Sequence, residues 1–151
     1  MANTQAMCTS FKTEILSGIH ALGTTVIRAG TGADTIKAAL YLASATVNAA
    51  TTAYSVTGEV SGAGYSAGGV TATNATAPTS SGTTAYWTPS ASFTYTTVTL
   101  TTSFDCVLVY NSTQSNKAIS VHTFGAQTIT AGTFVLSMPT NDASNALIRI
   151  A

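Results

Sequence analysis

The sequence predicts a mainly-β domain: an antiparallel β-sandwich or jelly roll with one short N-terminal helix. Short apolar or alternating runs recur about every 8 to 12 residues and are separated by turn residues, which is typical of sandwiches. The chain also has about 30 threonines, a residue that favours strands. With 151 residues, we expect one domain over 10–151, preceded by a small, polar and flexible arm over 1–9.

A single short stretch near the N-terminus has the apolar spacing of a helix. Ser10 is placed to cap a helix over 11–17, and Gly18 is placed to end it. About two turns are too few for a helix that is stable alone, so this one must dock on the sheet. Its apolar face consists of Phe11, Ile15 and Leu16.

The remaining elements are predicted to be strands joined by turns. The run 104–110 is apolar on both faces and is expected to be a central strand, followed by a turn over 111–116. Segment 77–89 is rich in proline, serine and threonine and predicts a long surface loop. The last strand is expected to turn Ile148 and Ile150 inward. The predicted strands are 36–43, 54–60, 70–76, 93–102, 104–110, 117–124, 133–138 and 146–150.

Charge is scarce and balanced. Only 7% of the residues are charged, against about 25% in an ordinary soluble domain, and the formal net charge is zero. A nucleic-acid partner is therefore not expected, because phosphate binding needs a basic face. No apolar run approaches the length of a membrane span and no signal peptide is indicated, so no membrane partner is expected either. Cys8 and Cys106 are far apart in the sequence and predict two free thiols, although a disulfide stays open.

The most distinctive stretch is the glycine-rich segment 57–70, which holds five of the twelve glycines. Residues 62–67 fit a loose dinucleotide-binding fingerprint, but that site needs a helix to follow, and Val70 begins a strand-forming run. We therefore expect a structural turn between strands, anchored by Glu59 binding loop amides, and no cofactor. The residues assigned to this turn are Gly58, Glu59, Gly62, Gly64, Tyr65, Gly68 and Gly69.

No catalytic or metal-binding pattern stands out. His20 and His122 lie about a hundred residues apart, and neither has an acid or cysteine at ligand spacing. Each histidine is expected to be exposed or to make a structural hydrogen bond. Glu14 and Glu59 are the acids nearest distinctive sequence, but a hydrolase needs a carboxylate pair in a cleft. The sequence predicts a protein that is not an enzyme and holds no metal.

An ordered set of short segments covers most of the chain. Its members include Ser10-Phe11-Lys12, Ile36-Lys37, Thr52-Ala53-Tyr54, Gly58-Glu59-Val60, Gly68-Gly69, Val109-Tyr110-Asn111, Gly132 with Phe134, and Ile148-Arg149-Ile150. Together they resemble a family of small structural proteins from tailed bacteriophages. The resemblance implies a virion component, most simply a capsid decoration or cement protein, with a jelly-roll dimer or trimer as the expected form. The Ala/Thr-rich segments 21–35 and 77–89 depart from the pattern, so no contacts are carried over there.

These observations predict a function in assembly. We expect a non-enzymatic protein that binds the phage major capsid protein and copies of itself on the capsid surface, after synthesis in the host cytoplasm. The alternative is a receptor-binding module on a tail or head fibre, with Tyr86 and Trp87 exposed to a host glycan. The residues proposed for partner contacts are Met1, Ala2, Asn3, Thr4, Gln5, Tyr86 and Trp87.

Overall fold

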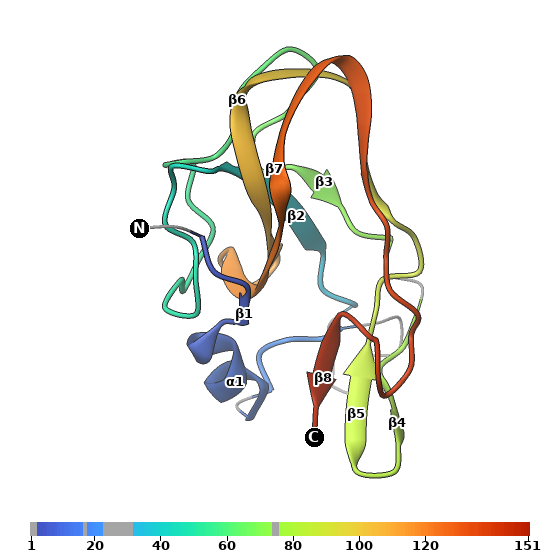
Figure 1. Cartoon of the computed structure of the whole chain (residues 1–151). Helices are drawn as coiled ribbons and strands as arrows, with labels where there is room; N and C mark the ends of the chain where they lie inside the picture. The colour runs from blue at the N-terminus through green and yellow to red at the C-terminus, as the bar shows by residue number, and fades with distance from the viewer. Residues whose placement is uncertain (1–2, 17, 23–31, 74–75) are drawn as a thin grey trace.

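Two antiparallel sheets and one helix make up the protein, as the computed structural model in Figure 1 shows for residues 3–16, 18–22, 32–73 and 76–151. The larger sheet has the strand order β1-β7-β6-β2-β3, and the smaller sheet has the order β4-β5-β8. The predicted mainly-β, sandwich-like class is confirmed. The elements are β1 (Ala6–Met7), α1 (Thr9–Leu16), β2 (Ile36–Leu42), β3 (Val70–Thr71), β4 (Thr79–Ser81), β5 (Thr84–Trp87), β6 (Phe93–Asn111), β7 (Lys117–Leu136) and β8 (Ile148–Ile150).

The long hairpin of β6 and β7 is the frame of the larger sheet. The sequence predicts two shorter strands in place of each, but both strands continue through the expected breaks by means of bulges, including register shifts between Leu100 and Phe104. Thr97 and Ala131 adopt positive φ angles of 53° and 48° in this bulged part. Bulges bend a strand without ending its pairing. Figure 1 accordingly shows the two strands arching together over the top of the molecule.

The core is centred on the half of this hairpin that pairs with β2. The predicted central run 104–110 is buried throughout except at Asp105, which is half-buried. Helix α1 packs against β7 and contributes Phe11, which is fully buried. Burying such a side chain stabilises the fold by roughly 1.5 to 3 kcal/mol, which compensates a helix too short to stand alone. The helix begins at Thr9, so Ser10 is not its cap, and the buried Ser10 hydroxyl has no hydrogen-bond partner among the described residues.

The N-terminal residues are part of the sheet and not a free arm from Asn3 onward. Ala6 and Met7 pair with Val121 and Ser120 of β7, and Cys8 is fully buried. The Asn3 side chain donates to Leu42 O at 3.1 Å and to Asp105 Oδ1 at 2.6 Å, and accepts from Val47 N at 2.8 Å. The composition suggested an arm because the residues are small and polar, but these polar groups bind backbone inside the domain. Met1 and Ala2 lie outside the described residues.

Two segments have a different structure from the predicted one. Residues 54–60 are irregular, with a single bridge from Glu59 to Tyr41, and not a strand. Segment 77–89, predicted to be a surface loop, contains the β4–β5 hairpin, whose second strand pairs with β8. That pairing buries Trp87 to 1% exposure, and its indole donates to Thr76 O.

The C-terminal strand shows one further correction. Ile148 is buried as predicted, whereas Ile150 is 44% exposed. Both residues pair with β5, opposite Trp87 and Ala85 respectively. The rest of the chain covers the small sheet at Ile148 but leaves the side chain of Ile150 largely uncovered. The cysteines are both buried and free, in agreement with the prediction.

Asn3→Ala should lower the free energy of unfolding by about 1 to 3 kcal/mol, because it removes the acceptor of the Val47 amide and the donor to the Asp105 carboxylate. Thr4→Ala is the matched control, since Thr4 is exposed. Urea denaturation measures both. Equal stability of the two variants would mean that the segment is an arm after all.

Candidate functional site

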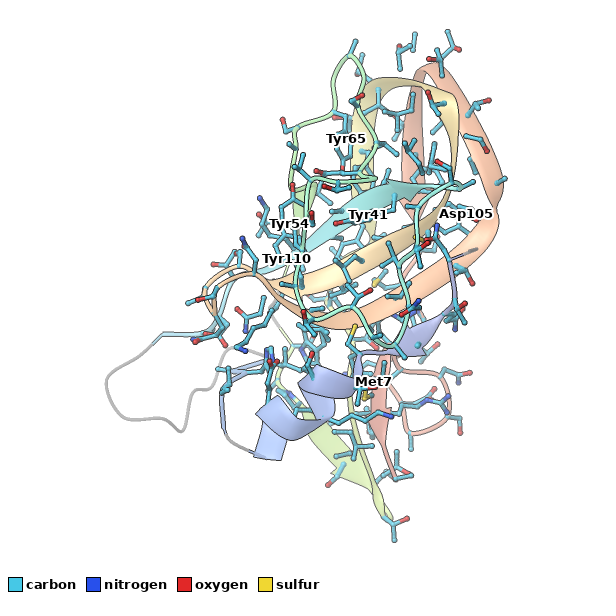
Figure 2. All side chains as sticks on the ribbon, turned by 90° about the vertical axis from the view of Figure 1, so that its left-hand side faces the viewer. Met7, Tyr41, Tyr54, Tyr65, Asp105 and Tyr110 are labelled. Carbon is cyan, nitrogen blue, oxygen red and sulfur yellow. The ribbon has the colours of Figure 1, made fainter. Side chains whose placement is uncertain are left out.

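The glycine segment, residues 57–70, runs beside the sheet and does not form a turn between two strands. Val60 N donates to Leu40 O at 3.0 Å, and Thr99 N donates to Ala63 O at 2.8 Å. The segment therefore spans from β2 to the bulged part of β6. Figure 2 shows it next to these strands, with Tyr65 labelled. Its glycines allow its backbone to lie close to the backbones of these strands. The strand predicted before it, 54–60, is not formed.

Two glycines show why side chains are excluded here. A Cβ on Gly62 would lie 2.0 Å from Thr99 O, and one on Gly69 would lie 1.8 Å from Ala38 O. Gly69 also has a φ of 68°, in the left-handed region that favours glycine. The segment thus lies directly against the backbones of β2 and β6. This is a structural use of glycine, as the sequence predicts, and not a phosphate cradle.

Glu59 anchors the segment from inside. It is 7% exposed, and its carboxylate accepts from Tyr54 Oη at 2.6 Å, Tyr65 Oη at 2.7 Å and Gly68 N at 2.7 Å. The prediction that Glu59 binds loop amides is confirmed for Gly68. Within the described residues no cation pairs with this carboxylate, so three hydrogen bonds replace its hydration.

The tyrosines around Glu59 are tied to the backbone as well. Tyr65 Oη accepts from Leu40 N at 3.0 Å, and Tyr110 Oη donates to Gly68 O at 2.8 Å. Tyr54 stacks on Tyr110 with ring centroids 4.7 Å apart. Figure 2 places Tyr54, Tyr65 and Tyr110 around the same part of the sheet. Burial raises the pKa of Tyr110 to about 12, so its hydroxyl stays a donor at neutral pH.

The bonds to Glu59 tie together three parts of the irregular region. Both carboxylate oxygens accept at least one hydrogen bond, and the two hydroxyls that bind them belong to half-buried tyrosines with raised pKa values, caused first by desolvation at Tyr54 and Tyr65. The Glu59 network therefore fixes the glycine segment in place.

A second polar cluster joins α1 to the turn between β6 and β7. His20 Nε2 lies 2.8 Å from Glu14 Oε2, and Lys117 Nζ lies 2.6 Å from Glu14 Oε1. Asn111 Nδ2 lies 3.0 Å from His20 Nδ1 and donates to Asp34 Oδ2 at 2.8 Å. The expectation of a hydrogen-bonded structural histidine is confirmed for His20. Its partner Glu14 was not predicted from the sequence: Glu14 lies six residues earlier, inside α1, whereas His20 lies beyond the end of the helix.

The chemistry of this cluster defines one histidine tautomer. Nδ1 faces an amide donor, so it accepts, and Nε2–H donates to Glu14. Burial lowers the pKa of His20, against the opposing effect of Glu14. Burial alone would raise the pKa of Glu14, but the hydrogen bonds from Lys117 and His20 bring it below its usual value. No group of three or more metal-ligating side chains occurs among the described residues.

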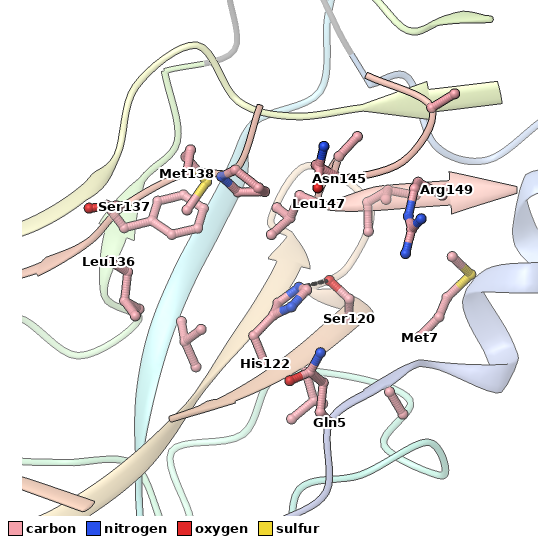
Figure 3. A pocket seen from close by; sticks show the side chains of 18 of the residues that line it. Gln5, Met7, Ser120, His122, Leu136, Ser137, Met138, Asn145, Leu147 and Arg149 are labelled. Carbon is pink, nitrogen blue, oxygen red and sulfur yellow. Dashed lines mark hydrogen bonds between the residues drawn. The ribbon is translucent and has the colours of Figure 1, made fainter. Parts of the chain in front are cut away.

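A cavity of about 780 Å³ lies where the two sheets approach each other, between β1 and β7 on one side and β8 on the other. We call it the β1–β8 pocket. Ser120 and His122, on the same face of β7, lie in its wall with Ser120 Oγ 2.9 Å from His122 Nε2 (Figure 3). Burial lowers the pKa of His122 to about 4, so the ring is neutral at pH 7. Its lining includes Gln5, Met7, Ser120, His122, Leu136, Met138, Asn145, Leu147 and Arg149.

The proposed partner contacts have different positions. Trp87 is buried and so is not a surface platform, and Tyr86 is half-buried opposite Arg149 in the small sheet. Asn3 is engaged inside the domain, whereas Thr4 and Gln5 are exposed.

The pairing of Ser120 with His122 was not predicted from the sequence. Its signal was the spacing of two residues, which puts both side chains on one face of a strand.

No family model, no curated protein and no solved structure matches this chain. Among the described residues, no helix is both long and apolar enough to span a membrane.

Gly62→Ala should lower the free energy of unfolding by more than about 2 kcal/mol, because the new methyl group overlaps Thr99 O and the segment must move away from β6. Gly125→Ala is the control, since no atom lies within 4 Å of its added Cβ. Chemical denaturation compares them. A loss at Gly125 equal to that at Gly62 would contradict the close-approach explanation.

Stability should decrease in acid because of His122. Its pKa is depressed in the folded state, so the unfolded chain binds the proton first as the pH falls from about 6.5 to 4. Between pH 7 and pH 4 the unmodified protein should lose about 3 kcal/mol more than His122→Gln. Urea titrations at several pH values measure this difference. Parallel pH profiles of the two proteins would show that His122 is not desolvated.

Proposed function

We propose that this chain is a non-enzymatic structural protein of a tailed-phage virion, which decorates the capsid by binding the major capsid protein and other copies of itself. The ordered segments that resemble small phage structural proteins support this proposal. The structural observation that carries it is the long, exposed and uncharged outer edge of β7.

This edge is open over most of its length. β1 pairs with β7 at Val121 and Ser120, and the backbones of Cys8 and Thr52 bind β7 at Ile119 and Ala118. From 122 to 136, β6 is the one strand partner of β7 among the described residues. Most side chains over 125–133 are exposed, and β7 lies at the margin of the molecule in both Figure 1 and Figure 2. An open edge offers unpaired backbone donors and acceptors to another chain.

The usual protection of such an edge by charge is missing. No charged residue occurs over 118–141, nor over 60–104, which includes most of the strand beside it. Soluble monomers commonly place lysine or proline on an edge to prevent pairing, and β7 has neither after Lys117. The bulges bend the strand but leave it uncovered. Many weak edge contacts acting together would hold a protein firmly on a repeating lattice.

The polar clusters support the non-enzymatic part of the proposal. Both oxygens of the Glu59 carboxylate are already bound by donors of the chain itself. Ser120 and His122 resemble two members of a nucleophilic triad, but no acid contacts His122 among the described residues. A histidine with a pKa near 4 is also a weak base at neutral pH.

The receptor-binding alternative, which used Tyr86 and Trp87, loses one of its two aromatic residues. Trp87 is 1% exposed and its indole nitrogen is bound to Thr76 O, so it cannot stack on a sugar. Deleting residues 1–9 is not a clean test of the proposal either, because the deletion removes β1 and the buried Cys8. Substitutions on the exposed edge of β7 leave the core untouched.

The double variant Thr128→Lys and Thr130→Lys should bind capsids of the encoding phage at least about tenfold more weakly, because lysines on an open edge strand oppose its pairing with another chain. Thr57→Lys with Ser61→Lys is the matched control, with the same added charge on exposed residues outside β7. Co-sedimentation with capsids that lack the protein measures occupancy. Equal occupancy of the two variants would exclude the β7 edge as the contact.

The location of the protein provides the direct test of the function. Cryo-EM of the native particle should show its density on the head lattice, in many copies. Density confined to the tail, or the absence of the protein from purified particles, would overturn the proposed function.

A further inference from the structure

The β1–β8 pocket has the size and the lining of a site for a small molecule. Its volume of about 780 Å³ lies within the range of about 300 to 1,000 Å³ that is usual for ligand pockets. It opens between the edge strands of the two sheets, β1 and β8, with β7 forming its wall (Figure 3). Neither the Glu59 network nor the exposed edge of β7 uses it.

Polar side chains converge on one part of this pocket. Ser120 is 2% exposed and its hydroxyl lies against Nε2 of His122. The other ring nitrogen, Nδ1, has no hydrogen-bond partner among the described residues. When Ser120 donates to Nε2, the neutral ring carries its proton on Nδ1 and offers a donor there. Gln5 and Asn145 add amide groups to the lining.

Arg149 is the one charged side chain of the lining, which includes no acidic side chain. Its guanidinium has one hydrogen bond within the described chain, from Nη1 to Ser144 O at 2.5 Å. Asp142, in the loop before β8, interacts electrostatically with Arg149, but its carboxylate is already bound by Ser144 N at 2.8 Å and by Asn145 N at 2.7 Å. Arg149 therefore keeps unused donors, and a planar guanidinium matches the two oxygens of a carboxylate.

The rest of the pocket is apolar and adaptable. Figure 3 shows Met7, Leu136, Met138 and Leu147 around the hollow, on the strands and loop that enclose it. Methionine side chains are unbranched and flexible, so they fit ligands of varied shape. A hydrocarbon group placed among them would be removed from water at a gain of roughly 0.8 kcal/mol per CH₂.

We propose that the β1–β8 pocket binds a small amphiphilic monocarboxylate, with the carboxylate between Arg149 and His122 and the hydrocarbon among Met7, Met138, Leu136 and Leu147. Arg149 is the one charged side chain of the lining, and its unused donors match one carboxylate. The neutral histidine adds a hydrogen-bond donor and no second charge. This activity is independent of the capsid-binding role proposed above.

The full chain is titrated with octanoate. NMR shifts of the His122 ring and of backbone amides that line the pocket report the binding. Octanoate should saturate these shifts and bind at least about tenfold more tightly than octan-1-ol, which has the same hydrocarbon and no charge. Because the bound anion stabilises the protonated ring, octanoate should also raise the pKa of His122 from its value near 4. Octylamine should not bind.

Arg149→Gln should weaken octanoate at least about tenfold and leave octan-1-ol unchanged. Lys12→Gln is the matched control, because it removes the same charge from an exposed position outside the pocket. Both residues are exposed, and the amide spectrum verifies that each variant is folded. His122→Gln gives a second, independent variant that should lose the preference for octanoate over octan-1-ol.

Three results would overturn the proposal. One is octan-1-ol binding as tightly as octanoate, which would mark an apolar cavity without anion recognition. Another is equal octanoate affinity in Arg149→Gln and Lys12→Gln. The third is a titration without saturable shifts at the pocket residues. None of these results would bear on the binding of the protein to capsids, which the β7 variants test separately.

Discussion

The buried carboxylate of Glu59 is the interaction on which the arrangement of this protein depends. It has no cation beside it in the described structure, and three donors from the chain itself satisfy it. Each donor lies on a different part of the irregular region between β2 and β3. Tyr54 precedes Glu59, whereas Tyr65 and Gly68 follow it. The carboxylate therefore gathers a long irregular stretch at one point on the sheet, where glycines allow the backbones to meet.

The other acidic side chains are likewise bound by donors within the protein. All five acids accept hydrogen bonds from within the protein: Glu14 from Lys117, Asp34 from Asn111, Glu59 from Tyr54, Asp105 from Asn3 and Asp142 from Asn145. Three of them, Glu14, Asp34 and Glu59, are buried. Charge that would otherwise repel neighbouring molecules is thus used to fix loops and the N-terminus. The outer surface is left to hydroxyl and small apolar groups, which suits a protein that packs against others.

Sequence patterns predicted the fold class, the strand 36–43, the central run 104–110 and the turn over 111–116, because local periodicity and turn residues determine them. They did not predict that β6 and β7 continue through their bulges, since the residues with positive φ there are Thr97 and Ala131, residue types that do not mark a bulge. The neighbouring Thr88 and Pro89 indicate a loop at Trp87, but the pairing of β5 with β8 buries this side chain. Such long-range pairing leaves no local signal.

The candidate sites also differ in whether they could be predicted from the sequence. The role of Glu59 could be predicted because it is the one acid of a glycine-rich stretch. The partnership of Glu14 with His20 and Lys117 depends on where the chain returns after the helix, and the β1–β8 pocket depends on the approach of two sheets. Neither is a property of neighbouring residues.

The stability of Glu59→Gln, compared with Tyr54→Phe, tests the central claim most directly. The glutamine presents an amide group to donors that need an acceptor, so Glu59→Gln should lose at least about 2 kcal/mol, and Tyr54→Phe only about 1 kcal/mol. Exchange of the Gly68 amide should become at least about tenfold faster in Glu59→Gln. A Glu59→Gln protein within about 0.5 kcal/mol of the original, with Gly68 equally protected, would contradict the account.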